Sequence, residues 1–167
     1  MTLILETNRL VLRTWTLEDS DVALQIWGDA EVMQFVGKPF ENIEAARRAL
    51  ENAIVAQDKQ GVCLWAAVEK SGGKVIGCCG FHSFEDGLEL AYHFIPQVWG
   101  KGYATEAAQA CLSYGFGKLQ AAKIVAFAHL ENSASFRVLE KIGLKYKGLV
   151  EFEGAKEKKY QLNRTEA

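Results

Sequence analysis

The sequence predicts one domain, residues 1–167, of the mixed α/β class, with a mostly antiparallel sheet and flanking helices. Three observations support this prediction. The middle of the chain has the composition and alternation of β-strands, the segments on either side have apolar residues at helical spacing, and glycines or prolines separate them. A chain of 167 residues is long enough for one domain with a sizeable core.

The first third of the chain is predicted to form one strand and two helices. Residues 10–15 are apolar and β-branched enough for a strand. Thr16 and Asp19 resemble a capping box, with Asp in place of the usual Glu, and begin a helix that ends near Gly28. Apolar residues in the segment 44–57 recur at helical spacing and predict the second helix.

The middle of the chain is predicted to be an antiparallel meander. Residues 63–70 and 74–81 form a hairpin around the glycine-containing turn 71–73. A third strand covers residues 88–94 and ends before Pro96.

Two helices and three strands are predicted after the meander. The helix from about 104 to 118 carries small apolar residues, which indicate close packing on the sheet. Residues 123–128 form a short buried strand, and a helix capped at Asn132 stops at Gly143. Residues 144–153 and 158–163 are predicted to be the last two strands.

Composition excludes several classes of function. Apolar residues are 49% and charged residues 24%, with a formal net charge of −2, which argues against nucleic-acid or anionic-membrane binding. No apolar run is long enough for a membrane span, and residues 1–5 do not resemble a secretory signal, so we expect a cytoplasmic protein.

The four cysteines are scattered along the chain and are expected to be buried as small hydrophobic residues: Cys63, Cys78, Cys79 and Cys111. Cys79, His82 and His93 would form only a partial metal-ligand set, so no metal is expected.

The stretch 97–107 is the most informative part of the chain. Gly100 and Gly102 allow the backbone to turn closely around a ligand, and the helix that follows offers unpaired N–H groups with a partial positive charge. This combination favours a phosphate-bearing ligand, although a tight turn without a ligand has the same spacing. The stretch lacks both the P-loop pattern and the dinucleotide-binding pattern.

The pattern Gln97-x-x-Gly100-x-Gly102-x-Ala104 resembles the pyrophosphate-binding motif of the GNAT superfamily of acyl-CoA-dependent N-acyltransferases. The longer run 99–107 is similar to its ribosomal-protein N-terminal acetyltransferase (Rim-type) branch. Segments 9–13, 89–92 and 132–143 also resemble that branch, which more often has Gly where Ala91 stands.

The resemblance implies a GNAT fold, with the sheet splayed at the cofactor site, and acetyl-CoA as cofactor. Backbone N–H groups from about Trp99 to Ala104 would hold the pyrophosphate, and the backbone of Phe94 and Ile95 would pair with the pantetheine arm. Lys101 would lie at the phosphate end of the cofactor, and the alternative is that its side chain is only a solvated surface charge. The implied cofactor-binding residues are Phe94, Ile95, Gln97, Trp99, Gly100, Lys101, Gly102, Tyr103, Ala104, Thr105, Asn132 and Ser135.

An attacking amine must lose a proton, because a free alkylammonium has a pKa near 10. Glu89 is the first candidate for the base, since apolar neighbours raise the pKa of a carboxyl group. His93 is the second candidate, and His82 and His129 follow. Strict alternation places Glu89 and His93 on one face of the strand, although a bulge would change this.

The leaving thiolate needs a hydrogen-bond donor or a helix N-terminus. Asn132 and Ser135 are the candidates, with a plain helix cap and a solvent-facing serine as the alternatives. The superfamily often has a tyrosine acid where Leu139 stands, and Ser135 is the Rim-type substitute that the resemblance implies.

The expected reaction is direct acetyl transfer in a ternary complex to a primary amine, either a protein N-terminus or a small molecule. A protein N-terminus would require an open groove. A small cationic molecule would require a closed pocket with convergent carboxylates such as Glu31 or Asp29. A non-catalytic acyl-CoA-binding module is the alternative function, and the chain is expected to be a monomer or homodimer. Segment 27–40 is expected to shape the amine pocket, whereas Trp15, Trp27, Trp65 and Phe35 are expected to be core residues.

Overall fold

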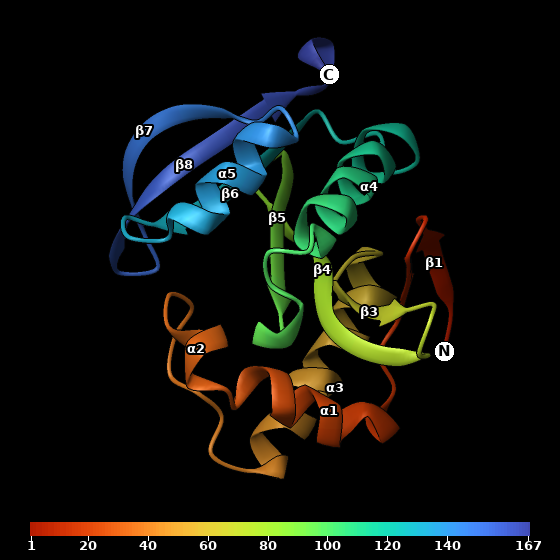
Figure 1. Cartoon of the computed structure of the whole chain (residues 1–167). Helices are drawn as coiled ribbons and strands as arrows, with labels where there is room; N and C mark the ends of the chain where they lie inside the picture. Colours follow the sequence, from red (N-terminus) through yellow and green to blue (C-terminus); the bar gives the residue numbers. More distant parts are fainter.

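The computed structural model describes residues 1–167 and contains one eight-stranded sheet of order β1-β2-β3-β4-β5-β6-β8-β7 (Figure 1). Every neighbouring pair is antiparallel except β5 and β6. The strands are β1 (Leu3–Glu6), β2 (Leu10–Arg13), β3 (Leu64–Glu69), β4 (Lys74–Phe84), β5 (Gly87–Phe94), β6 (Lys123–His129), β7 (Lys145–Phe152) and β8 (Ala155–Asn163). The predicted class, a mixed and mostly antiparallel sheet with helices, is confirmed.

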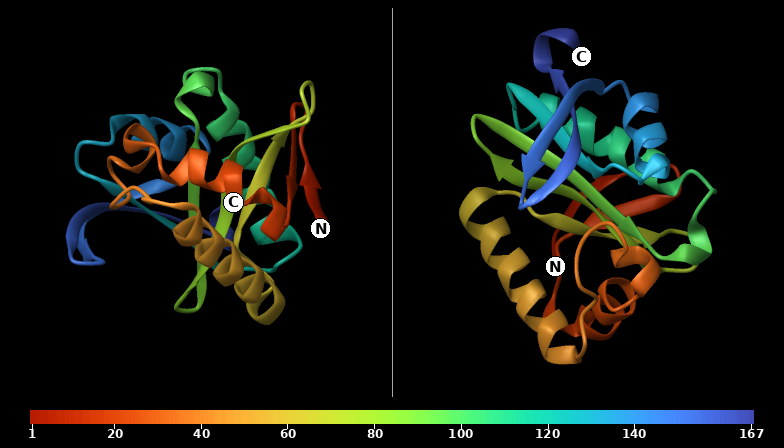
Figure 2. Two further views of the ribbon diagram at one scale, coloured as in Figure 1. Left: turned by 90° about the horizontal axis from the view of Figure 1, so that it is seen from below. Right: turned by 90° about the vertical axis from the view of Figure 1, so that its left-hand side faces the viewer.

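Helices cover both faces of the sheet. The first face carries α1 and α3, and the second carries α4 and α5 (Figure 2). The α-helices are α1 (Ser20–Trp27), α2 (Ala30–Met33), α3 (Ile43–Gln60), α4 (Tyr103–Gly117) and α5 (Ser133–Lys141), with short 3-10 turns η1 (Leu17–Asp19), η2 (Pro96–Val98) and η3 (Arg164–Glu166). None of these helices has both the length and the apolar composition that a membrane span requires.

The sheet opens between β5 and β6. These strands pair only at Leu88 with Ile124 and at Glu89 with Val125, after which they diverge. On its other side β5 stays paired with β4 along its whole length, from Gly87 to Phe94. The second half of β5 therefore has a strand partner on one side only.

The core has two parts, one on each face. The larger part lies under α4 and α5, and the smaller one lies under α1 and α3. Helix α4 sits very close to the sheet, because a Cβ added at Gly115 would lie 2.7 Å from Cδ1 of Ile124. This agrees with the packing predicted from the small residues of that helix. As predicted, Trp15, Trp27 and Trp65 are buried, and so are all four free cysteines.

Two short elements were not predicted, and three boundaries were misplaced by three residues: α3 ends at Gln60 and not at 57, β4 ends at Phe84 and not at 81, and β8 starts early. Strand β1 has only four residues at the edge of the sheet, and α2 is a single turn started by Asp29, whose Oδ1 accepts hydrogen bonds from the N–H groups of Glu31 and Val32. Strand β8 begins at Ala155, three residues before the predicted start at Lys158. The predicted capping box of Thr16 and Asp19 is present.

Candidate functional site

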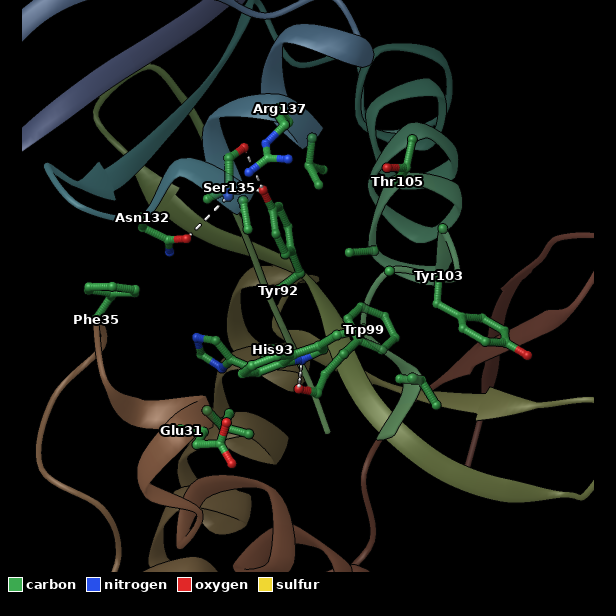
Figure 3. A pocket seen from close by; sticks show the side chains of 18 of the residues that line it. Glu31, Phe35, Tyr92, His93, Trp99, Tyr103, Thr105, Asn132, Ser135 and Arg137 are labelled. Atoms are coloured by element: carbon green, nitrogen blue, oxygen red, sulfur yellow. Dashed lines mark hydrogen bonds between the residues drawn. The ribbon is translucent and has the colours of Figure 1, made fainter. Parts of the chain in front are cut away.

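A cavity of about 820 Å³ opens beside the diverging end of β5. It lies between α2 with the segment after it, the end of β5, the turn that precedes α4, and the first turns of α5 (Figure 3). Residues from 31–36, 92–94, 98–105 and 132–141 line it, so four segments far apart in the sequence build this site.

The glycine turn forms one wall of the cavity. Gly100 and Gly102 have φ values of +73° and +81°, which side-chain-bearing residues rarely adopt. Gly102 is the N-cap of α4 and supplies no side-chain cap, so the amides of the first turn keep their hydrogen-bonding capacity. Arg137 and Lys141 of α5 line the same cavity. A helix N-terminus and two cationic side chains fit the phosphates of a nucleotide-like cofactor.

The glycine turn is tied to the N-terminal hairpin. Nη1 of Arg9 donates to the carbonyl of Lys101 at 2.9 Å, and the guanidinium stacks over the ring of Tyr103. Glu106, in the first turn of α4, accepts from Nε and the backbone N–H of Arg9 and from the hydroxyl of Thr7. These contacts hold the turn in position, which gives a structural reason for the Arg9 segment noted in the sequence.

Tyr92, Asn132 and Ser135 meet where β5 faces α5 (Figure 3). Oδ1 of Asn132 accepts from the backbone N–H of Ser135, so Asn132 is the helix cap. Oγ of Ser135 lies 2.9 Å from Oη of Tyr92, and burial raises the pKa of this tyrosine. Tyr92 was not among the predicted site residues, although strand alternation already places it on the face of β5 opposite Glu89.

Glu89 does not line the cavity. It lies at the last position where β5 and β6 pair, opposite His82 of β4 and Val125 of β6. Burial, together with the negative charges of Glu153 and Glu157, raises its pKa to about 7. The sequence-based expectation of a raised pKa is therefore met, and a proton from the cavity would need water to reach this carboxylate.

His93 lines the cavity from the opposite face of β5 to Tyr92. Nε1 of Trp27 donates a hydrogen bond to its Nδ1 at 3.1 Å. Burial and the nearby His82 lower the pKa of His93 to about 4, so the ring is neutral around pH 7.

A smaller slot of about 100 Å³ lies between β5 and β6. It adjoins the cavity, and several residues line both. Phe35 and His129 stack across it, with ring centroids 5.1 Å apart. Phe35 therefore belongs to the site and not to the core, contrary to the prediction. Apolar side chains form its other walls: Leu90, Ala91, Ala126, Phe127, Ala128 and Leu139.

Three predicted cofactor-binding residues lie outside the cavity wall: Ile95, Gln97 and Lys101. The proposed backbone role of Ile95 and the roles of Gln97 and Lys101 stay predictions. The predicted residues that do line it are Phe94, Trp99, Gly100, Gly102, Tyr103, Ala104, Thr105, Asn132 and Ser135. Trp99 is anchored by a hydrogen bond from its Nε1 to the carbonyl of Phe94 at 2.7 Å. Nowhere do three His, Cys, Asp or Glu side chains gather as a metal site would require.

Comparison with known families decides the class. The model of the acetyltransferase (GNAT) domain family matches residues 9–145. The chain belongs to the GNAT family of acetyltransferases. It is an enzyme of the N-acetyltransferase class, and the family uses acetyl-CoA as acetyl donor.

Relatives in bacilli support this membership. The chain is 34% identical over 157 residues to an uncharacterized N-acetyltransferase, p20, of Bacillus licheniformis, covering 91% of this chain and 88% of that protein. It is 37% identical over 152 residues to the uncharacterized protein YkkB of Bacillus subtilis, covering 85% of each.

Solved structures share the GNAT fold. A GNAT acetyltransferase from Bacillus anthracis superposes with a TM-score of 0.85 at 26% identity, covering 96% of this chain and 98% of that one. RimL, a ribosomal L7/L12 α-N-protein acetyltransferase in complex with coenzyme A, superposes with a TM-score of 0.86 at 15% identity, covering 97% and 98%. At 15% identity the second similarity shows the fold alone.

Proposed function

We propose that residues 1–167 form one acetyl-CoA-dependent N-acetyltransferase domain of the Rim-type branch, which transfers acetyl to a primary amine. The observation that carries the proposal is the cavity of about 820 Å³, which runs from the start of α4 to the hydrogen-bonded hydroxyls of Tyr92 and Ser135. The amides at the start of α4 are suited to phosphate binding, and the two hydroxyls where β5 faces α5 are suited to acyl transfer.

Bound acetyl-CoA would supply the acetyl thioester. The amides that follow Gly102, together with Arg137 and Lys141, would bind its phosphates. The second half of β5, which has no strand partner on the β6 side beyond Glu89, would offer backbone hydrogen bonds to its extended arm.

The amine nitrogen would attack the acetyl carbonyl carbon, the carbon–sulfur bond would break, and one amine proton would pass through water to Glu89. A base with a pKa of about 7 is suited to this task at neutral pH. Ser135, held by Tyr92, would donate its hydroxyl hydrogen bond to the leaving sulfur. Tyr92 would keep its own proton, because burial raises its pKa.

Direct attack is favoured over a cysteine-bound acyl group. None of the four cysteines lines the cavity, and all of them are buried. Burial raises the pKa of Cys63 and of Cys78 to about 12, so neither thiol supplies a thiolate near pH 7.

For the acceptor, we favour the α-amine of a protein N-terminus over a small polycation. Glu31 is the one carboxylate in the cavity wall, and Asp29 is occupied as the cap of α2. The convergent carboxylates that a polycationic amine would require are therefore lacking, and most of the side chains around the slot beside the cavity are apolar. A non-catalytic acyl-CoA-binding module would leave Glu89 and Ser135 without a role.

The experiment is a thiol-release assay with acetyl-CoA against peptides with free N-termini, polyamines, aminoglycosides and free amino acids. We expect release that depends on the acceptor and is strongest with one or more peptides. Binding of CoA in calorimetry, without release by any amine, would instead support the binding module.

A further inference from the structure

The hydrogen bond between Trp27 and His93 fixes which nitrogen of the histidine carries the proton. An indole N–H donates and cannot accept. Nδ1 of His93, 3.1 Å from Nε1 of Trp27, must therefore carry a lone pair and not a hydrogen. The second neighbour of Nδ1 is the thiol of Cys78 at 3.7 Å, which can also donate to it.

This arrangement allows one form of the ring. A doubly protonated imidazolium would bring two N–H groups face to face, as would the neutral form with hydrogen on Nδ1. The neutral ring with hydrogen on Nε2 is the form that satisfies Trp27. Trp27 is only 7% exposed and packs against Trp15, so it cannot turn away easily.

The remaining nitrogen belongs to the functional site. The ring of His93 lines both the cavity and the slot, and it projects from β5 toward the side where Glu31 and Phe35 lie (Figure 3). Tyr92 and Ser135 occupy the α5 side of the same strand end. The ring of His93 thus lies in the half of the site opposite Tyr92 and Ser135, with its Nδ1 taken by Trp27 and its Nε2 left for a ligand.

We propose that His93 acts on the acceptor as an uncharged hydrogen-bond donor through Nε2–H, with Trp27 as the residue that fixes its proton, and that it is not the base of the reaction. The group it contacts is an oxygen next to the acceptor amine, as in a peptide carbonyl. The inference rests on the proposed function for the acceptor and corrects the second choice of base made from the sequence.

The proton position can be tested on the whole protein without any substrate. Long-range ¹H–¹⁵N correlation spectra of histidine-labelled protein resolve the two ring nitrogens, and the chain has only two other histidines as internal references, His82 and His129. We expect His93 to show hydrogen on Nε2 and to stay in that form from pH 5.5 to 8. Hydrogen on Nδ1, or titration of His93 within that range, would overturn the proposal.

The role of Trp27 is tested by Trp27→Phe, with Trp15→Phe as the matched control. Both variants remove a buried indole N–H from the same cluster, but Trp15 donates to the carbonyl of Leu64 and not to His93. We expect the Nδ1–H form or a titrating ring only in Trp27→Phe. An unchanged His93 spectrum in a folded variant that carries both Trp27→Phe and Cys78→Ala would refute the assignment, because neither donor to Nδ1 remains.

The effect on the reaction is tested with the best acceptor found in the thiol-release assay. The His93→Gln variant keeps an N–H near the position of Nε2, whereas His93→Phe keeps only the ring. We expect kcat/KM of the Gln variant within about tenfold of the native value, and a loss at least several-fold larger in the Phe variant. A base would instead lose about 10²- to 10⁴-fold in both variants alike. Should no acceptor work, the proposed function fails while the spectra still decide the state of the ring.

Discussion

Arg9 and Glu106 form an ion pair of 2.6 Å between residues 97 positions apart in the chain. This ion pair connects the N-terminal hairpin to the first turn of α4, and Arg9 also bonds the glycine turn through the carbonyl of Lys101. The carboxylate also accepts from Thr7 and from the backbone N–H of Arg9, so one side chain satisfies three donors.

Replacing Glu106 by Ala would leave these donors without a partner. In urea denaturation at pH 7, we expect the free energy of unfolding of this variant to be about 1–3 kcal/mol lower than that of the native protein. The control is Glu41→Ala, which removes an exposed pair with Lys38 and is expected to cost less than about 1 kcal/mol. The hydrogen bonds lower the pKa of Glu106 below 4.5, so its contribution is present above that pH and is lost as the pH falls through the lowered value. Equal stabilities of the two variants would contradict this role.

Gly102→Val should weaken CoA binding strongly. A valine at φ +81° is strained, and its Cβ would lie 3.4 Å from Nη2 of Arg9, so the turn that presents the first amides of α4 would have to shift. Gly61→Val is the matched control, because Gly61 has φ +76° at the end of α3 and does not line the cavity. In isothermal titration calorimetry we expect the Gly102 variant to lose more than about tenfold in affinity, or 1.4 kcal/mol. Similar affinities of both variants would show that the cofactor lies elsewhere.

The reaction rate should depend on the protonation of Glu89. A base must be ionised to act, so kcat should rise with pH through about 7 and level off above it. The Glu89→Gln variant should lose this dependence and about 10²- to 10⁴-fold in kcat. The Glu153→Gln variant removes a negative charge that raises the pKa of Glu89, so it should move the rise toward lower pH. A pH profile that Glu153→Gln does not change would argue against Glu89 as the titrating group.

Glu89 should also make the stability of the folded protein depend on pH. Its pKa is about 7 in the folded protein and 4.5 in the reference state, so folding favours the protonated form. The native protein therefore keeps full stability from this group below pH 4.5 and loses it as the pH rises through 7. Thermal melts should show Glu89→Gln more stable than the native protein at pH 8, with the difference shrinking toward pH 5. A difference that is independent of pH would point to packing instead.

Ser135 and Tyr92 should act as one unit on the leaving group. A hydrogen bond to a developing thiolate predicts a loss of about 10- to 100-fold in kcat for Ser135→Ala. We expect kcat to fall about 3- to 10-fold in Tyr92→Phe. The double variant should lose little more than Ser135→Ala alone. The CoA affinity of these variants should stay near the native value. The control is Ser113→Ala, at an exposed serine of α4, whose kcat should also stay near the native value. Additive losses would mean that the two hydroxyls act independently.

The sequence was sufficient for most of the fold, because periodicity and caps are local. It could not predict α2, a single turn held by Asp29, or the short edge strand β1. For the site, the glycine turn and Asn132 were found because backbone conformation and helix caps depend on neighbouring residues. The pairs Tyr92 with Ser135 and Trp27 with His93 join positions 43 and 66 residues apart, which only tertiary packing brings together.

Between residues 90 and 94, β5 lies in the middle of the sheet but is bonded like an edge strand. Every second amide there faces a gap instead of a neighbouring strand. Such amides exchange their hydrogens with solvent readily unless something else bonds them. In the free protein, fast exchange should therefore occur at the centre of the molecule and not only at its periphery. Slowing of that exchange would follow cofactor occupancy residue by residue, without any need for turnover or a known acceptor.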